Sequence, residues 1–86
     1  MTSVSPSDSD ISIWRREIDR LDAQILAAVK ERTEISRKIG QARVASGGTR
    51  LVHSREMQVI NRYSELGQEG KDLAMVLLRL GRGHLG

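Results

Sequence analysis

Hydrophobic side chains recur every three or four positions along one long stretch of the chain. Nine of ten such positions are apolar and one is an arginine: Ile11, Trp14, Ile18, Leu21, Ile25, Ala28, Arg32, Ile35, Ile39 and Ala42. This spacing, here called the seam, is typical of the buried stripe of an amphipathic helix. No proline interrupts it, and Gly47 and Gly48 supply a stop. The pattern therefore predicts a single helix from Ile11 to about Ala45.

The length of this helix has a consequence for assembly. A helix of that span is roughly 50 Å long at about 1.5 Å per residue. A compact chain of 86 residues measures only about 25–30 Å across. Two shorter helices of the same chain cannot cover the whole seam, so a second copy is expected to cover the rest. We therefore predict an all-α fold: a three-helix subunit with one very long N-terminal helix, in an intertwined homodimer.

The ends of the chain lack a periodic apolar pattern. Residues 1–10 are rich in Ser and Asp and are predicted to form a disordered tail, with the helix N-cap at Ser9, Asp10 or Ser12. Residues 81–86 contain three glycines and are predicted to be a flexible segment that cannot hold a helix. The predicted helical domain thus covers residues 11–80.

Two shorter helices complete that domain. A glycine-containing loop at 45–53 leads to a helix predicted over 55–66, with Ser54 as its N-cap and Gly67 at its end. A third helix is predicted from Glu69 or Lys71 to Leu80. Almost every residue from Leu73 onward is apolar, so we expect this helix to be largely buried.

Composition excludes several classes of protein. The chain has no cysteine, so disulfide frameworks and thiolate metal sites are excluded. Its apolar runs are short and its N-terminus is polar, so the sequence predicts no membrane span and no signal peptide, and a cytoplasmic protein is expected. Fourteen Lys and Arg against eleven Asp and Glu give a net charge of +3, which suits an anionic partner.

Arg32 is the candidate site residue that the pattern itself singles out. A guanidinium within an apolar seam requires an anionic partner, because burying it alone is costly. Arg43 lies eleven positions later, about 20° around the helix, so both cations share one face. Arg15 lies roughly 25 Å from Arg32 along the axis and could serve only the pocket of a partner chain. Arg55 and Glu56 fall in the first turn of the second helix, where both could face a cavity.

Structural roles are alternatives for each of these residues. Arg32 could form a plain ion pair with Glu56 across the dimer. Arg43 and Arg55 could be solvated surface charges, and Glu56 could simply complement a helix dipole. The sequence offers no nucleophile motif, paired carboxylates or metal-ligand spacing. If the protein is an enzyme, we therefore expect no cofactor or metal, and electrostatic stabilisation and restraint of a small polyanion.

Residues 14–62 resemble the all-helical chorismate mutases of the shikimate pathway. The likeness rests on WRREIDRLDAQILAAVKERTEISRKIGQAR and, after a loop, HSREMQVINR. The GTRLVHSRE loop and the GKDLAMVLLRLGRG ending are similar to the short actinobacterial members, which are typically poor catalysts alone and bind deoxy-arabino-heptulosonate-phosphate (DAHP) synthase. The resemblance implies an isomerase of aromatic amino acid biosynthesis that converts chorismate to prephenate by a unimolecular pericyclic step.

The resemblance also implies roles for individual residues. Arg32 and the partner chain's Arg15 would hold the two carboxylates of chorismate. Arg43 would face its ether oxygen, and Arg55 would orient the substrate. Glu56 would accept a hydrogen bond from the substrate hydroxyl.

This sequence departs from the family pattern at two places. Val52 stands where the family has an aspartate, so only a main-chain group could act there. The ending GRGHLG offers no counterpart to the glutamine or glutamate that the family commonly uses at the ether oxygen.

Two other functions fit parts of the sequence. A pI near 10.0 suggests a small nucleic-acid-binding protein, but acidic residues are interleaved with the basic ones along the first helix and stacking aromatics are nearly absent. A non-catalytic helical dimerisation module would explain the seam but not Arg32 within it. We therefore expect chorismate and prephenate, a second copy of the chain and DAHP synthase as partners, and no nucleic acid or membrane.

Overall fold

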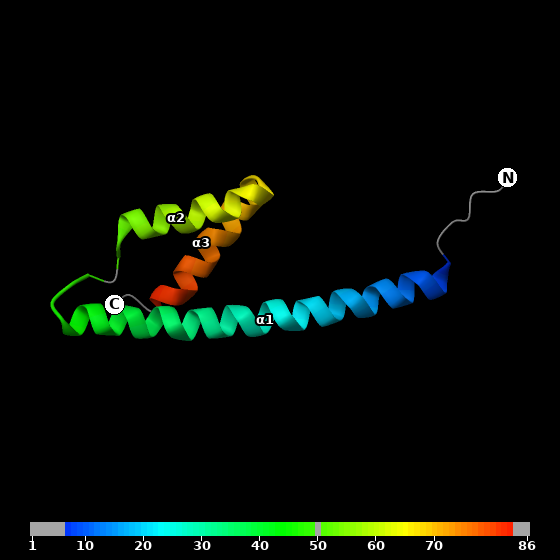
Figure 1. The fold of residues 1–86 in the computed structure, drawn as a ribbon, viewed down its shortest axis with the longest axis horizontal. Helices are drawn as coiled ribbons and strands as arrows, with labels where there is room; N and C mark the ends of the chain where they lie inside the picture. Colours follow the sequence, from blue (N-terminus) through cyan, green and yellow to red (C-terminus); the bar gives the residue numbers. More distant parts are fainter. Residues whose placement is uncertain (1–6, 50, 84–86) are drawn as a thin grey trace.

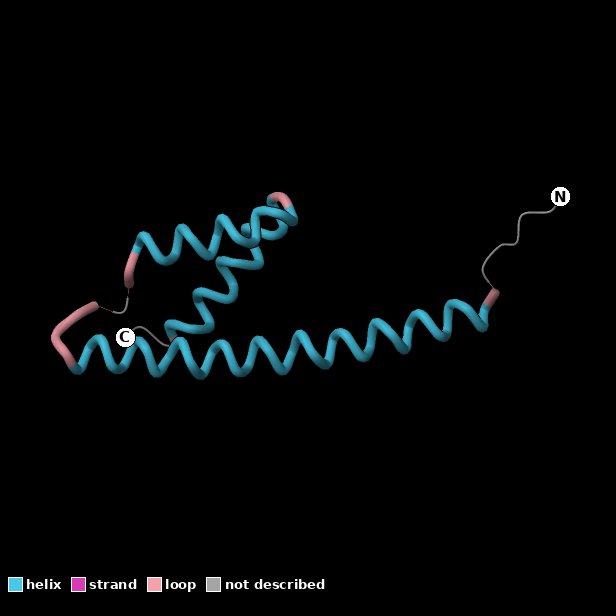
Figure 2. Tube along the Cα trace, in the orientation of Figure 1, coloured by secondary structure: helices cyan, strands magenta, loops and turns pink. Residues whose placement is uncertain are grey.

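Three α-helices and one short 3-10 turn make up the part of the chain that the structure describes (Figure 1). The structure is a computed structural model that describes residues 7–49 and 51–83. Helix α1 spans Asp8–Ala45, α2 spans His53–Tyr63 and α3 spans Gln68–Arg82, while the 3-10 turn η1 (Ser64–Leu66) joins the last two. Within these described ranges there is no strand (Figure 2). The predicted all-α, three-helix subunit is confirmed.

Helix α1 begins earlier than the seam predicts. Ser7 is its N-cap: the Ser7 hydroxyl accepts a hydrogen bond from the Asp10 N–H (3.3 Å), and the Asp10 carboxylate accepts one from the Ser7 N–H (3.1 Å). This reciprocal capping box satisfies two main-chain donors that the helix end would otherwise leave free. The helix therefore starts at Asp8 rather than Ile11, and the prediction that residues 8–10 belong to a disordered tail is wrong. Residues 1–6 lie outside the described part of the chain.

The glycine pair ends α1 as predicted. Gly47 has a φ of 85°, which only glycine adopts without strain. The Gly48 N–H then donates to the carbonyl of Arg43 (2.7 Å), and a Cβ on Gly48 would lie 3.2 Å from that same oxygen. The chain thus folds closely over the last turn of α1, the turn that carries Arg43.

Helix α2 starts at His53, two residues before the predicted Arg55, and Val52 rather than Ser54 is its N-cap. The Val52 carbonyl accepts hydrogen bonds from the N–H groups of Arg55 and Glu56, each at 3.1 Å. No side chain caps this end. Main-chain hydrogen bonds to Val52 therefore start the helix at His53. The prediction that Ser54 is the N-cap is wrong.

Glycines also set the boundaries of α3. Gly67, with a φ of 74°, terminates the η1 turn and precedes α3, so the helix predicted over 55–66 is divided into α2 and η1. Helix α3 continues through Gly81 and Arg82 to a C-cap at Gly83. The prediction that the segment from Gly81 onward cannot hold a helix is therefore wrong for Gly81 and Arg82. Residues 84–86, the rest of that predicted segment, lie outside the described residues.

Helix α3 packs against both α1 and α2, but the buried core is small (Figure 1). Among the described residues, the buried hydrophobic ones are Val59 of α2 and Ala74 and Leu77 of α3. The prediction that α3 is largely buried fails for this single subunit, because Leu73, Met75, Val76 and Leu80 are 40–42% exposed.

No residue of α1 is buried. The subunit measures 70 × 23 × 18 Å, and the N-terminal half of α1 extends beyond the other two helices (Figure 1). The first five seam residues lie on this extension and are 38–60% exposed: Ile11, Trp14, Ile18, Leu21 and Ile25. The seam is thus an apolar surface that a single subunit leaves open. None of the described helices combines the length and apolar character needed to cross a membrane.

Candidate functional site

A pocket of about 580 Å³ lies between the C-terminal half of α1, the beginning of α2 and the end of α3. This volume is in the range that holds a small molecule. Five of the six residues that the sequence singled out line it: Arg32, Arg43, Val52, Arg55 and Glu56. The structure therefore brings together residues that come from two helices and the loop between them.

Arg32 lies at the contact between α1 and α3. Its Nη1 donates to the main-chain carbonyl of Leu77 (3.2 Å), in the C-terminal half of α3. Among the described residues this is the hydrogen bond that Arg32 makes, so four of its five N–H donors remain for a ligand. Among the described residues, the hydrogen-bond partner of Arg32 is thus a neutral carbonyl, and the anionic partner that the sequence predicts for it is not found within the subunit.

Arg43 and Arg55 approach the pocket from either side of the loop. Both side chains are exposed, which agrees with the surface role that the sequence left open. Arg55 donates through Nη1 to Gln58 Oε1 (3.3 Å), one turn further along α2. Because both residues nevertheless line the pocket, their guanidinium groups can also serve a ligand bound there.

Glu56 pairs with Arg82, not with Arg32. Arg82 Nε and Nη2 both donate to Glu56 Oε2, at 3.1 and 2.5 Å. The two side chains are only 19–20% exposed, and both line the pocket. The alternative of an Arg32–Glu56 ion pair is therefore absent from this subunit, and the first turn of α2 is tied to the last turn of α3 instead.

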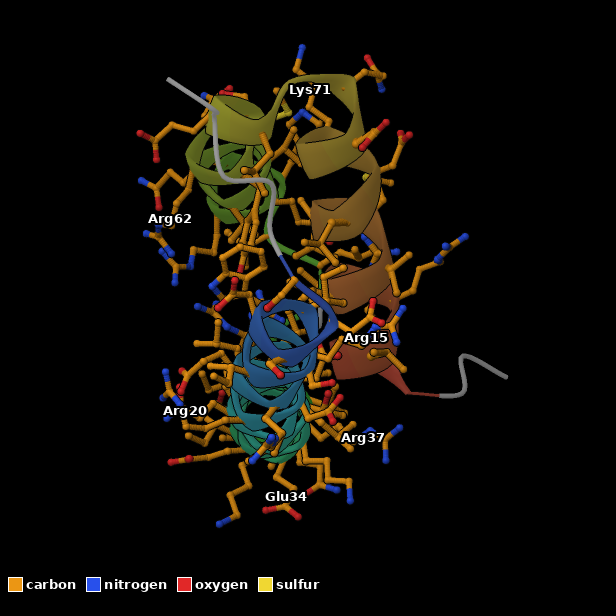
Figure 3. The ribbon with its side chains drawn as sticks, turned by 90° about the vertical axis from the view of Figure 1, so that its right-hand side faces the viewer. Arg15, Arg20, Glu34, Arg37, Arg62 and Lys71 are labelled. Atoms are coloured by element: carbon orange, nitrogen blue, oxygen red, sulfur yellow. The ribbon has the colours of Figure 1, made fainter. Side chains whose placement is uncertain are left out.

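Arg15 does not line the pocket. It lies on the part of α1 that extends past the other helices, about 25 Å along the axis from Arg32. Figure 3 looks along α1 and shows Arg15 near the viewer, on the side of the helix where Arg37 also projects. Within one subunit, Arg15 and Arg32 cannot reach the same small molecule.

Four further polar residues line the pocket without having been predicted: Glu31, Ser36, Arg37 and Arg82. Arg82 was missed because three glycines in six residues predicted a mobile ending. Arg37 lies about 140° around α1 from Arg32, too far to be assigned to the same face from periodicity alone. The sequence signal that could have placed Arg82 in α3 is the apolar run of that helix, which ends at Leu80, two residues before Arg82.

The charge of the pocket fits a small dianion. The described lining contains five arginines and two glutamates, and no lysine or aspartate. Its formal charge is therefore +3, concentrated in guanidinium groups that bind carboxylates with two parallel hydrogen bonds. Such an arrangement can bind two carboxylates and still place a cation beside an oxygen that gains negative charge during a reaction.

Comparisons with known proteins agree with this geometry. The family described as chorismate mutase type II matches residues 14–80. A curated intracellular chorismate mutase of Mycobacterium tuberculosis is 73% identical over 77 residues, which are 90% of this chain and 73% of that protein. The corresponding protein of Mycolicibacterium smegmatis is 70% identical over 78 residues, 90% of this chain and 75% of that one.

A solved structure is also similar over most of the chain. It is a non-covalent complex of DAHP synthase and chorismate mutase from Corynebacterium glutamicum with a bound transition state analog. The matching chain has a TM-score of 0.85 and 57% sequence identity, and the match covers 92% of this chain and 96% of that one.

Proposed function

Because this chain belongs to the type II chorismate mutase family, we propose that it catalyses the rearrangement of chorismate to prephenate, an isomerase reaction of aromatic amino acid biosynthesis. The observation that carries the proposal is the pocket itself. It joins Arg32, Arg43, Arg55 and Glu56 around a volume of about 580 Å³. The relatives are named intracellular, and we propose the same location for this chain.

The reaction suits a pocket of this composition. Chorismate carries two carboxylates and rearranges in one unimolecular step, in which a C–O bond breaks as a C–C bond forms. No nucleophile is required, so the protein must bind the reactive conformer and stabilise charge in the transition state. Enzymes accelerate reactions by at least about 10⁶-fold, or about 8 kcal/mol. Several charge-assisted contacts in a partly enclosed site are of the right order to provide this.

Four of the residues that line the pocket then have distinct roles. Arg32 has four N–H donors available within its subunit and holds a carboxylate. Arg43 faces the ether oxygen and stabilises the negative charge that develops there. Arg55 orients the substrate, and Glu56 accepts a hydrogen bond from its hydroxyl. At Val52 only the main chain is polar, and its carbonyl already accepts two helix N–H groups.

We further propose that the active unit is a homodimer in which Arg15 of one chain completes the pocket of the other. The subunit exposes 7194 Å², whereas a compact protein of 9.6 kDa exposes about 5,100 Å². The excess of about 2,100 Å² is comparable to what one subunit contributes to an obligate dimer. Pairing the extended halves of α1 covers the seam and carries Arg15 toward the second subunit's pocket.

The similarity to a chain from a complex with DAHP synthase supports the proposal that this protein also binds that enzyme. Such binding would couple the first step of the pathway to the branch that consumes chorismate. The direct experiment follows the loss of chorismate absorbance with purified protein, alone and with the DAHP synthase from the same source. We expect turnover that the synthase increases. No turnover in either condition would contradict the proposed activity.

A further inference from the structure

The ion pair between Glu56 and Arg82 joins the ends of two helices, and both side chains line the pocket. Glu56 lies in the first turn of α2, and Arg82 is the last residue of α3. Both side chains are about four-fifths buried although both carry charge. A charged pair with this degree of burial requires close geometry, because each group has given up much of its hydration.

Only one oxygen of Glu56 is used by this contact. Arg82 Nε and Nη2 both donate to Oε2, and no hydrogen bond from the described residues reaches Oε1. Two donors on one oxygen hold Oε2 close to Arg82 and so limit the rotation of the carboxylate. Oε1 is thereby left to accept a hydrogen bond from a molecule in the pocket.

The pair also changes the electrostatics of the site. A substrate with two carboxylates is repelled by any unpaired carboxylate that lines its pocket. Arg82 compensates the charge of Glu56 where the two groups meet. The pocket can therefore present a hydrogen-bond acceptor to a substrate hydroxyl without presenting a full negative charge to the rest of the same molecule.

We propose that Arg82 is a positioning residue for the mutase reaction: it holds Glu56 through Oε2 so that Oε1 accepts the substrate hydroxyl. The inference rests on the proposed function and adds to it a residue from a segment that the sequence predicted to be mobile. It also links activity to the C-terminal turn of α3, because Arg82 reaches Glu56 only while that turn is helical. Gly81, the preceding residue, is buried against Ser36 of α1 and anchors the turn.

The test compares Arg82→Gln with a matched control, Arg79→Gln, which removes an exposed cation from the same last turn. Steady-state chorismate turnover is measured for both, in the wild-type background and in Glu56→Gln. Helical circular dichroism and sedimentation establish that each variant is folded. Binding of a dicarboxylate transition-state analogue is measured by calorimetry in parallel, since it reports on the pocket even where turnover is slow.

We expect Arg82→Gln to lower kcat/KM at least about tenfold, mostly through kcat, because the hydroxyl loses an aligned acceptor. Arg79→Gln should change it less than about twofold, and Arg82→Lys should fall between the two because one ammonium cannot copy the two-donor contact. In the Glu56→Gln background, Arg82→Gln should have little further effect.

Two results would overturn the inference while leaving the proposed function intact. One is wild-type turnover in Arg82→Gln. The other is an equal loss with and without Glu56, which would show that Arg82 acts directly or only structurally. Failure of wild-type protein to turn over chorismate or bind the analogue, with or without the synthase, would instead overturn the proposed function and this inference with it.

Discussion

Gly81 of α3 packs directly against Ser36 of α1. A Cβ placed on Gly81 would lie 2.3 Å from Ser36 Oγ and 2.8 Å from Ser36 Cβ, distances that real contacts do not show. Gly81 is buried there, one residue before Arg82. The absence of a side chain at this position therefore sets how near the end of α3 comes to α1, and so how the pocket is closed.

Gly81→Ala should consequently destabilise the protein. The added methyl must displace Ser36 or push α3 outward, and overpacking of this kind costs roughly 1–3 kcal/mol. The gain of about 1 kcal/mol from replacing glycine within a helix offsets only part of this cost. We expect a lower denaturation midpoint in urea at an unchanged m-value.

The matched control for this prediction removes the obstructing side chain. Ser36→Gly combined with Gly81→Ala restores the space between the helices, so the double variant should be more stable than the sum of the two single changes. Strict additivity would show that the helices do not meet as described.

Val52→Asp should stabilise α2. Val52 occupies the N-cap position with extended backbone, and no side chain caps the helix. An aspartate there can accept hydrogen bonds from the free N–H groups of the first turn, which is worth about 0.5–2 kcal/mol. Thermal unfolding should shift upward, whereas the isosteric Val52→Thr should give a smaller gain. A drop in stability with Asp would argue against Val52 as the N-cap.

Ile18→Glu should prevent dimer formation. Ile18 is 55% exposed in the subunit and belongs to the seam, so a charge there would be buried in the proposed interface. With so few buried apolar residues in one subunit, loss of the dimer should also reduce helicity. Sedimentation and circular dichroism measure both effects.

The control for Ile18→Glu is Glu34→Gln, on the same helix. Figure 3 shows Glu34 pointing away from α2 and α3. This variant should stay dimeric and helical. An Ile18→Glu protein that remains a well-folded dimer would exclude pairing through the seam.

The sequence predicts the long helix well because its signal is repeated many times over. Nine apolar residues of the seam agree on one period, and two consecutive glycines mark its end. The predicted start of the helix is wrong because it depends on one local contact, between Ser7 and Asp10. These two residue types are the same as those of the polar tail around them, so the sequence does not mark the cap. Periodicity therefore locates the helix but not its cap.

The candidate site was predictable only in part, for a related reason. Arg32 stands out because it interrupts an apolar pattern, and Arg43 follows from helix geometry. Arg82 depends on tertiary packing: glycine propensity predicts a mobile end, yet the contact of Gly81 with Ser36 holds the turn in helical form. Propensity is a weak guide where packing requires a residue without a side chain.

The proposed activity depends on a pocket that is shared between two subunits, and complementation tests this sharing most directly. Arg15→Ala and Arg32→Ala should each be folded and nearly inactive, since each lacks a carboxylate partner worth roughly tenfold or more in rate. When the two are unfolded together and refolded in equal amounts, half of the dimers combine both chains, and each has one intact pocket. Chorismate turnover should then recover to about a quarter of the wild-type rate. A refolded mixture no more active than its two components would contradict the shared site.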